Sequence, residues 1–513
     1  MELAANLSSQ PSATAILATA VLDGRSHNEL LPIHQLPPEL LYIIIETAYT
    51  QVSYKLLFTL RSVCKHWMEI IDSMPQLWAH IASHQNANLL STILQKSTTQ
   101  PLDVWCREGE GYHLGDGPTF EERVAVFLEH VGPSAARWGS LHYLAPANAQ
   151  HEQILGLSFH NLETLVADIR GTAVDYTGRF NAPSIGNLDV SGLSLNWSSL
   201  SGLRSLQLGG CVPSPTINEL YLLLTSSPDL ELLKIKMDRS SPTGQTTDLS
   251  TTHSARIHLP RLRTLLITQV PFVSYSRLLD LVEAPNLSRF MVFQFFNFRS
   301  YDFTPMFESA GRLIGAFRHP RDRDDPSRLK ISGDSGHLGV IVGNRRVILK
   351  DNTWTSESRR RERAAGLSTV IRQFDARLCD EIRVVRFSGI RDGQEMLDLA
   401  HIANRRLCNV VNLEVKLPTT SPHDGLSILG RMSSLPIEGS QSLWFPKLVA
   451  LQFDVLEGME CDGILEVVKV RRNMEQVQAI RQLTIQGGKI RKESLDELKA
   501  NVEELNLVDT KVI

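Results

Sequence analysis

A chain of 513 residues is too long for one compact core, so its length predicts a small module joined to a large domain or an extended repeat array. The hydrophobic content of 42% and the charged content of 21% are ordinary for folded protein and exclude a largely disordered chain. The formal net charge of −4 gives no overall attraction to nucleic acid or to an anionic membrane, which leaves protein as the expected partner.

The six cysteines are scattered singly without a C-x-x-C pair, which argues against a disulfide framework and against a structural zinc site. A reducing compartment fits this distribution, so we expect a cytoplasmic or nuclear protein. The apolar stretch 13–22 is short and follows an acidic residue, unlike a signal peptide. No apolar run reaches the length of about 18 residues that a membrane span needs, so no membrane partner is expected.

Residues 1–30 are rich in serine, alanine and threonine without a sustained period, which predicts a mobile leader. Dense apolar sequence follows the prolines that begin at Pro32. Pro38 suits the first turn of a helix, where its missing N–H costs nothing, and Glu39 faces the positive end of the helix dipole. We therefore predict a helix over about residues 38–48.

Residues 53–73 repeat their apolar side chains at i, i+3, i+4 and i+7, which predicts one amphipathic helix with Ser53 as its N-cap. Met74 and Pro75 should end this helix. Residues 76–81 then predict a third, short helical turn. Together these helices predict a small three-helix bundle over residues 31–84.

This ordered set of residues resembles the F-box family. The matching residues are Leu36, Pro37, Glu39 and Leu40, then Ile44 and Ile45, then Val63, Cys64 and Trp67. The stretch Pro75–Trp78 that follows is common in the large fungal branches of the family. The loop between the first two helices is a few residues longer than in compact family members.

The resemblance implies docking to a Skp-type adaptor and, through it, to a cullin. Such docking would bury apolar side chains in a groove. The candidate adaptor-binding residues are Leu36, Pro37, Leu40, Ile44, Leu60, Val63 and Trp67. A plainer alternative is a generic amphipathic helix hairpin that only packs against the rest of the chain.

Residues 85–513 contain an apolar-x-x-apolar-x-apolar pattern, the core of a leucine-rich repeat. Its ten clear instances begin the predicted strands at 185–190, 203–208, 230–235, 262–267, 287–292, 382–387, 410–415, 448–453, 480–485 and 502–507. Chance alone would supply on the order of ten matches. Five of them, however, have proline two residues before the first apolar position: Pro183, Pro228, Pro260, Pro285 and Pro446. Each proline should fix an extended approach to its strand.

Segments between the strands, such as residues 214–227, have helical spacing and predict an outer helical layer. We therefore predict an α/β fold in which the F-box-like bundle precedes an irregular leucine-rich-repeat solenoid, a curved parallel sheet with outer helices. The matches lie about 18 to nearly 40 residues apart, so the repeat is degenerate. Residues 300–368 interrupt the series as an irregular insertion or an irregular central section, which turns at glycines like a β-hairpin or small meander.

Motifs for catalysis and metal binding have simpler structural interpretations. Gly333-Asp334-Ser335-Gly336 imitates the nucleophile signature of trypsin-like proteases, but its apolar flanks favour a hairpin turn. His80 and His84 lie i, i+4 apart without a third ligand, which favours solvated residues at a helix end. We expect no enzymatic activity, no catalytic residues, no cofactor and no metal.

The leading hypothesis is a substrate-recognition subunit of an SCF-type E3 ubiquitin ligase, which binds the adaptor through residues 31–84 and an unidentified target protein through residues 85–513. The second is a repeat scaffold for protein–protein interaction outside any ligase, in which the N-terminal helices cap the repeat. A hydrolase that uses Ser335 is the third. Deleting residues 31–84 should separate the first two, because loss of a cap lowers thermal stability whereas loss of an independent docking module does not.

Overall fold

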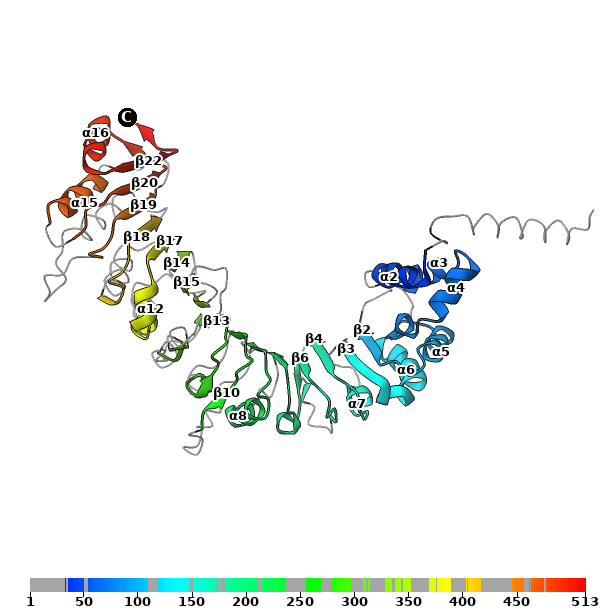
Figure 1. Cartoon of the computed structure of the whole chain (residues 1–513). Helices are drawn as coiled ribbons and strands as arrows, with labels where there is room; N and C mark the ends of the chain where they lie inside the picture. The colour runs from blue at the N-terminus through cyan, green and yellow to red at the C-terminus, as the bar shows by residue number, and fades with distance from the viewer. Residues whose placement is uncertain are drawn as a thin grey trace, which may run out of the picture.

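The chain forms an open arc, with helices at its N-terminal end and strands along its inner side (Figure 1). This computed structural model describes residues 33, 36–49, 54–108, 119–146, 151–170, 174–175, 180–210, 215–236, 255–268, 278–296, 308–310, 312–313, 328–334, 337–342, 345–351, 369–374, 376–388, 403, 405–416, 445–455, 461, 463–474 and 477–513. The leader predicted over residues 1–30, Ser53 and Ser335 lie outside the described residues.

The first described helices are α2 (Pro38–Tyr49), α3 (Tyr54–Arg61) and α4 (Lys65–Asp72). α2 begins at Pro38 with Glu39 in its first turn, as predicted. The prediction of one helix over 53–73 is wrong, because the Ser62 hydroxyl donates to the Thr59 carbonyl at 2.7 Å and closes the end of α3. Cys64 is then extended, with φ −161° and ψ 170°, before α4 begins.

The third predicted helical turn is the 3₁₀ helix η2 (Pro75–Trp78). It stops three residues earlier than predicted, because His80 begins the short strand β1 (His80–Ala82). β1 pairs in parallel with β2 (Leu102–Arg107), so the sheet starts inside the predicted N-terminal module. A single cluster of buried apolar residues runs from Leu41 to Leu498 through this junction. The core is therefore continuous across residue 84.

Most strands belong to one sheet of 17 strands within the described residues. After β1 and β2 its spatial order is β3 (Trp138–Pro146), β4 (Thr164–Arg170), β6 (Asn187–Ser191), β8 (Ser205–Gly209), β9 (Leu232–Lys236), β11 (Thr264–Thr268), β13 (Arg289–Phe296), β16 (Arg345–Asp351), β15 (His337–Val342), β14 (Arg328–Asp334), β17 (Val384–Ser388), β18 (Asn412–Lys416), β19 (Ala450–Asp454), β20 (Gln482–Gln486) and β22 (Glu504–Val508). Every neighbouring pair is parallel except β16–β15 and β15–β14.

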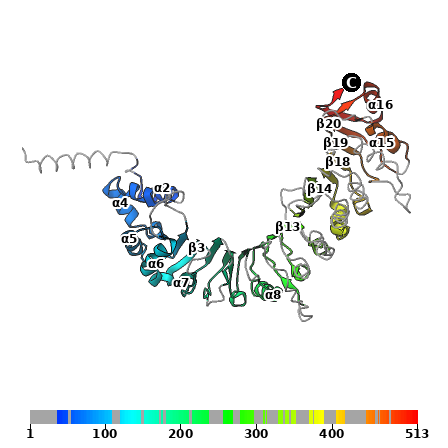
Figure 2. The ribbon, with the colours of Figure 1, turned by 180° about the vertical axis from the view of Figure 1, so that it is seen from behind.

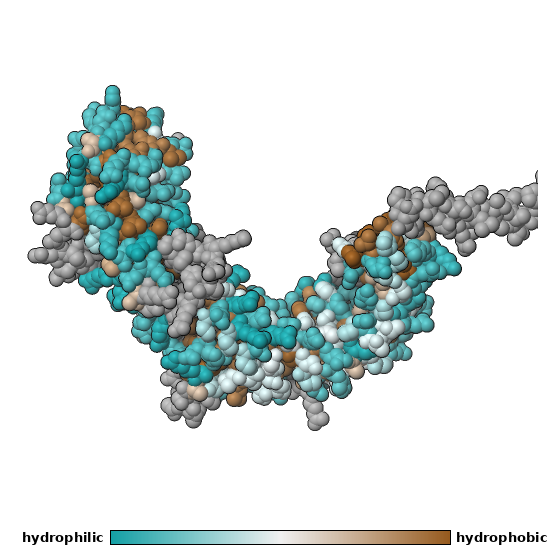
Figure 3. All heavy atoms as spheres, in the orientation of Figure 1, coloured by the Kyte–Doolittle hydropathy of each residue, from teal (hydrophilic) through white to brown (hydrophobic). Residues whose placement is uncertain are grey.

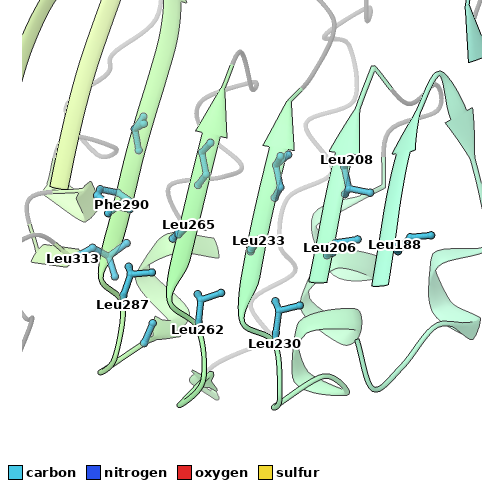
Figure 4. Packing of buried hydrophobic residues seen from close by; sticks show 14 of the residues in the cluster. Leu188, Leu206, Leu208, Leu230, Leu233, Leu262, Leu265, Leu287, Phe290 and Leu313 are labelled. Atoms are coloured by element: carbon cyan, nitrogen blue, oxygen red, sulfur yellow. The ribbon is translucent and has the colours of Figure 1, made fainter. Parts of the chain in front are cut away.

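All ten predicted strands are confirmed as strands, and their apolar residues lie in register. Leu188 aligns with Leu206, which aligns with Leu233, and the row continues through Leu265 to Phe290. Figure 4 shows this row and, below it, Leu230, Leu262 and Leu287, which are the first apolar residues of their triplets. Because side chains alternate along a strand, one face of the sheet carries the core and the other carries the intervening polar residues.

The five prolines occupy turns rather than the extended backbone that we predicted. In each case the N–H of the first apolar residue donates to the carbonyl of the residue before the proline, as from Leu230 to Ser227 and from Leu262 to Leu259, both 3.2 Å. The same bond occurs at Pro183, Pro285 and Pro446. Proline is favoured at the second position of such turns because its φ is already set. Each of these prolines therefore lies in a turn that directly precedes a strand.

The predicted meander is confirmed as β14, β15 and β16, which pair antiparallel in sequence order. Of the two predicted alternatives, the strand pairing favours an irregular central section over an insertion. β16 pairs in parallel with β13 and β14 pairs in parallel with β17, so the meander supplies three strands of the sheet itself. The buried residues Leu329, Ile331 and Val340 continue the apolar core through it.

Helices lie along the outer side of the arc (Figures 1 and 2). They are α5 (Ala87–Lys96), α6 (Phe120–Val131), η3 (Gly132–Arg137), α7 (His151–Leu155), η4 (Trp197–Ser199), α8 (Ile217–Thr225), α12 (Ala376–Glu381), α15 (Gly463–Arg472) and α16 (Lys492–Asn501). Three small parallel ladders complete the described strands: β5 (Val174–Asp175) with β7 (Leu193–Ser194), β10 (Ile257–His258) with β12 (Val282–Glu283), and β21 (Lys489–Ile490) with β23 (Lys511–Val512). α8 confirms the helix predicted over 214–227 and begins with a capping box of Thr216 and Glu219.

Candidate protein-docking surface

Exposed apolar side chains gather on the N-terminal helices. Of the large hydrophobic residues that are exposed in the described chain, six lie between residues 33 and 63: Ile33, Leu40, Ile43, Ile44, Phe58 and Val63. We call these six the exposed apolar surface. Figure 3 shows hydrophobic residues over α2 at this end of the molecule. Exposed apolar residues that gather on one part of a folded protein mark interaction sites.

Helix α2 carries this surface because it is apolar on two faces. Leu41 and Ile45, one turn apart, are 0% and 1% exposed and pack into the core. Leu40, Ile43 and Ile44 are 45%, 58% and 43% exposed, and their i, i+3, i+4 spacing places them on one face. A helix that covers a core normally turns polar residues outward. The outward apolar face of α2 is therefore suited to a protein partner.

The break between α3 and α4 leaves Val63 exposed. The Val63 N–H donates to the Leu60 carbonyl at 3.2 Å, which tightens the end of α3, and the Val63 side chain is 52% exposed. Phe58 on α3 lies edge-on to the buried Trp78 ring, with 6.0 Å between centroids. The Trp78 indole N–H donates to the Ile71 carbonyl at 3.0 Å, so the ring under Phe58 is held in place.

The seven predicted adaptor-binding residues divide by burial. Leu40, Ile44 and Val63 are exposed, as is Pro37. Leu36 and Leu60 are partly buried and pack against the core. Trp67 is 7% exposed and belongs to the core. Their roles in docking stay predictions, and the geometry makes the first four candidates for direct contact and the last three candidates for support.

Three residues of the exposed apolar surface were missing from the predicted set: Ile33, Ile43 and Phe58. Ile43 lies three residues after Leu40, so the helical period that selected Leu40 and Ile44 could have selected it as well. Phe58 belongs to the apolar sequence of α3, and its neighbour Leu57 is fully buried. Periodicity identifies apolar positions, but it does not say which apolar face remains uncovered.

Ion pairs hold the helices beneath this surface together. Arg61 donates to both carboxylate oxygens of Asp72, at 2.9 and 3.0 Å, and Lys96 lies 2.8 Å from Asp72 Oδ2. Burial raises the pKa of Asp72, but hydrogen bonds from Arg61 and Lys96 outweigh burial and leave this pKa below its usual value. One carboxylate thus connects α3, α4 and α5.

A second polar group fixes the helices to the sheet. The Tyr54 hydroxyl donates to the His80 carbonyl, which joins α3 to β1. Asp103 on β2 accepts from Trp105 Nε1 at 2.7 Å and from the Ser140 hydroxyl, and its Oδ2 lies 2.9 Å from His80 Nδ1. We call Tyr54, His80, Asp103, Trp105 and Ser140 the junction network. His80 therefore lies on a strand in a hydrogen-bonded network, and its predicted place as a solvated helix-end residue is wrong.

Rings extend the junction network across the inner face. Trp105 stacks on His142 of β3, with 3.9 Å between centroids and 11° between planes. The Arg107 guanidinium lies 3.7 Å from the Trp105 centroid. Burial lowers the pKa of His142, so neutral imidazole is favoured in this stack. These rings pack along β2 and β3, next to the strand β1 that Tyr54 joins to α3.

Among the described residues no group of His, Cys, Asp and Glu side chains could hold a metal ion. Asp334 and His337 pair across the β14–β15 hairpin, which agrees with the predicted turn at the protease-like motif. In the described part of the chain no helix combines the length and apolar character needed to cross a bilayer.

Comparison with known proteins identifies the part of the chain that carries the exposed apolar surface. Residues 33–84 match the family model described as F-box-like. The matched range includes α2, α3, α4, η2 and β1. No curated protein sequence matches the chain. Residues 33–84 are therefore an F-box-like domain, and this match supports an F-box protein.

Proposed function

We propose that the chain is the substrate-recognition subunit of an SCF-type E3 ubiquitin ligase that works in the cytoplasm or nucleus. The F-box-like domain binds a Skp-type adaptor and thereby a cullin, and the sheet recruits a target protein. The chain performs no chemistry itself. One observation carries the proposal: the outward face of α2, within the F-box-like match, is apolar at Leu40, Ile43 and Ile44.

We also infer that residues 85–513 form a degenerate leucine-rich-repeat solenoid of the kind found in the large fungal F-box families. The support is the constant parallel register, the turn before each proline-marked strand and the helices on the outer side of the arc. Each strand buries its apolar residues against its neighbours, which is the principle of a stacked repeat.

The expected strength of adaptor binding follows from the apolar area that is still exposed. Fully burying a Leu or Ile side chain contributes about 1.5–3 kcal/mol, and the residues on α2 have roughly half of that burial left to gain. Three such side chains can supply a few kcal/mol before the costs of association are subtracted. Phe58 and Val63 enlarge the same surface.

A pull-down with purified Skp-type adaptor tests this function. We expect the Leu40→Ala, Ile44→Ala double variant to bind the adaptor about 10- to 100-fold more weakly, because both side chains lie at the centre of the proposed contact. The matched control is Val126→Ala, Leu222→Ala, which removes two apolar side chains that are 46% and 51% exposed on the outer helices α6 and α8. Equal binding by both double variants would show that this surface does not dock the adaptor.

The alternative function is a repeat scaffold outside any ligase, with the N-terminal helices as a cap. The continuous core and the β1–β2 pairing favour a capping role. Deleting residues 31–84 would remove an edge strand under either function, so that deletion does not separate the two. The Leu40→Ala, Ile44→Ala variant does separate them, because it leaves Leu41 and Ile45 in the core. If the chain is a scaffold, this variant should be as stable as wild type, and the wild-type chain should not bind the adaptor.

A further inference from the structure

The inner face of the sheet is basic between β9 and β18, although the whole chain has a net charge of −4. Inner-facing residues alternate with the core residues, as Lys234 and Lys236 alternate with the buried Leu233 and Ile235. Between β9 and β18, the inner-facing side chains that the structure describes include seven basic residues: Lys234, Lys236, Arg289, Arg328, Lys330, Arg386 and Lys416. We call these seven the basic inner face. The acidic residue among these described positions is Glu414.

Acidic side chains flank the basic inner face on both sides. Toward the N-terminal end, β2, β4 and β6 carry Asp103, Asp168 and Asp189, together with Arg107 and Arg170. Toward the C-terminal end, β19 and β22 carry Asp454 and Glu504, and Asp454 Oδ2 lies 2.8 Å from the Nζ of Lys416 in the basic inner face. Charge on this face is therefore segregated into a basic middle and more acidic ends.

Glu414 does not neutralise the basic residues around it. Its Oε1 accepts from Arg328 Nη2 at 2.6 Å, and its Oε2 lies 3.6 Å from Arg386 Nη1. The Glu414 side chain is 9% exposed, whereas those of Arg328 and Arg386 are 51% and 38% exposed. One carboxylate compensates the charge of one of the two guanidinium groups, and both arginine side chains remain partly exposed.

We propose that the basic inner face binds an acidic segment of the target protein, rich in Asp and Glu. This proposal rests on the proposed function for the role of the sheet in target binding, and it adds the chemistry of the target. The eight strands from β9 to β18 span roughly 34 Å at about 4.8 Å per strand, which an extended segment of about ten residues covers. A charge-complementary surface of this size steers and selects its partner.

The flanking acidic residues favour a short acidic segment over nucleic acid. A phosphate backbone that continued past β9 would meet Asp189 and Asp168, and one that continued past β18 would meet Asp454. Repulsion at both ends disfavours a long polyanion, whereas a protein segment can change its side chains at the edge of the basic region.

The test measures fluorescence anisotropy of labelled peptides with the full chain. The probes are an alternating Glu-Ser peptide of about ten residues, the same peptide with Gln for Glu, and a single-stranded oligonucleotide of matched charge. We expect the Glu-Ser peptide to bind and its affinity to fall as salt is raised. The Gln-Ser peptide should not bind.

A pair of charge-matched variants locates the site. Lys234→Gln, Lys236→Gln removes two basic side chains that lie in neither the core nor the Glu414 group, and it should weaken Glu-Ser binding about tenfold. Lys492→Gln, Lys499→Gln removes the same charge from the exposed surface of α16 and should leave binding unchanged.

The proposal is overturned if the Glu-Ser peptide fails to bind at low salt, if both variants weaken binding equally, or if the oligonucleotide binds more tightly than the peptide. Adaptor binding gives an independent readout. The Lys234→Gln, Lys236→Gln variant should bind the adaptor as wild type does, whereas Leu40→Ala, Ile44→Ala should bind the Glu-Ser peptide as wild type does. Failure of the peptide experiment and failure of the ligase function are thus distinguishable.

Discussion

The two ends of the sheet differ in how their outermost strands are covered. At the N-terminal end, β1 lies beneath η2 and the helices, and its Ile81 and Ala82 are 0% and 3% exposed. At the C-terminal end, Leu505 and Leu507 of β22 hold the same register as their neighbours but are only partly buried, and Val508 is 43% exposed. Strands with the same apolar pattern are therefore buried to different extents, because the burial of their side chains depends on the elements that cover the strand.

This difference gives the N-terminal helices two tasks. Their inner faces cover the first strand of the sheet, and the outer face of α2 presents the exposed apolar surface. A variant that removes the whole module changes both tasks at once. Single side chains separate them, since Trp78 belongs to the cover and Leu40 and Ile44 belong to the surface.

The largest effect on stability is expected from Trp78→Ala. The Trp78 side chain is fully buried, donates to the Ile71 carbonyl and lies between Phe58 and Tyr54. Its removal leaves a cavity and an unpaired carbonyl, so the free energy of unfolding should fall by about 3–5 kcal/mol. Urea unfolding followed by circular dichroism measures this loss.

Phe58→Ala is the control for Trp78→Ala. Phe58 touches the same ring but is 39% exposed, so its removal should lower the free energy of unfolding by less than about 1.5 kcal/mol. A loss below about 1 kcal/mol for Trp78→Ala would show that the helices do not cover the sheet end as described.

A smaller effect separates the middle of the sheet from its C-terminal end. Leu206 on β8 and Leu505 on β22 occupy equivalent core positions, but Leu206 is fully buried and Leu505 is not. Leu206→Ala should lower the free energy of unfolding by about 2–5 kcal/mol. Leu505→Ala should lower it by about 1 kcal/mol, because the methyl groups of Leu505 are less buried in the wild-type chain.

Hydrogen exchange gives a second readout of the same pair. Amides of β22 should exchange faster than those of β8 in the wild-type chain, since strands with few buried contacts open locally. Equal losses of stability for Leu206→Ala and Leu505→Ala, with equal exchange rates, would contradict the difference in cover.

The strands that sequence reasoning found and those that it missed differ in their core residues. The ten predicted strands fill both inward positions with Leu, Ile, Val or Phe. In β2, β3 and β4 the corresponding positions hold Cys106, Tyr143 and Ala167. A pattern written for large aliphatic residues does not detect these, although the register of the backbone is the same. Spatial pairing, rather than composition, defines them as members of the sheet.

The candidate site could be predicted from the sequence where burial follows the helical period. It could not be predicted at the turn that separates α3 from α4. Leu60, Val63, Cys64 and Trp67 keep helical spacing, which predicted one helix. The chain instead turns at Ser62–Cys64, so Val63 is exposed and Trp67 is buried. Side-chain capping by a single serine decides this break, and that contact depends on the folded geometry.

The smallest expected effect concerns the junction network at the covered end. Burial raises the pKa of Asp103, but hydrogen bonds from His80, Ser140 and Trp105 outweigh burial and lower it. A lowered pKa means that the ionised carboxylate stabilises the fold above its unfolded pKa of about 3.9, and that this contribution is lost as the pH falls through the folded pKa. Asp103→Asn should therefore lower the free energy of unfolding by about 1 kcal/mol at pH 7.

The pH dependence distinguishes this role from simple packing. The difference in unfolding free energy between wild type and Asp103→Asn should shrink as the pH is lowered from 5 toward 3, because wild-type Asp103 then becomes protonated as well. Trp105→Phe, which keeps a ring beside His142 but removes one donor to Asp103, should show a smaller part of the same trend. A difference that is constant across this range would mean that the charge of Asp103 does not hold the helices to the sheet.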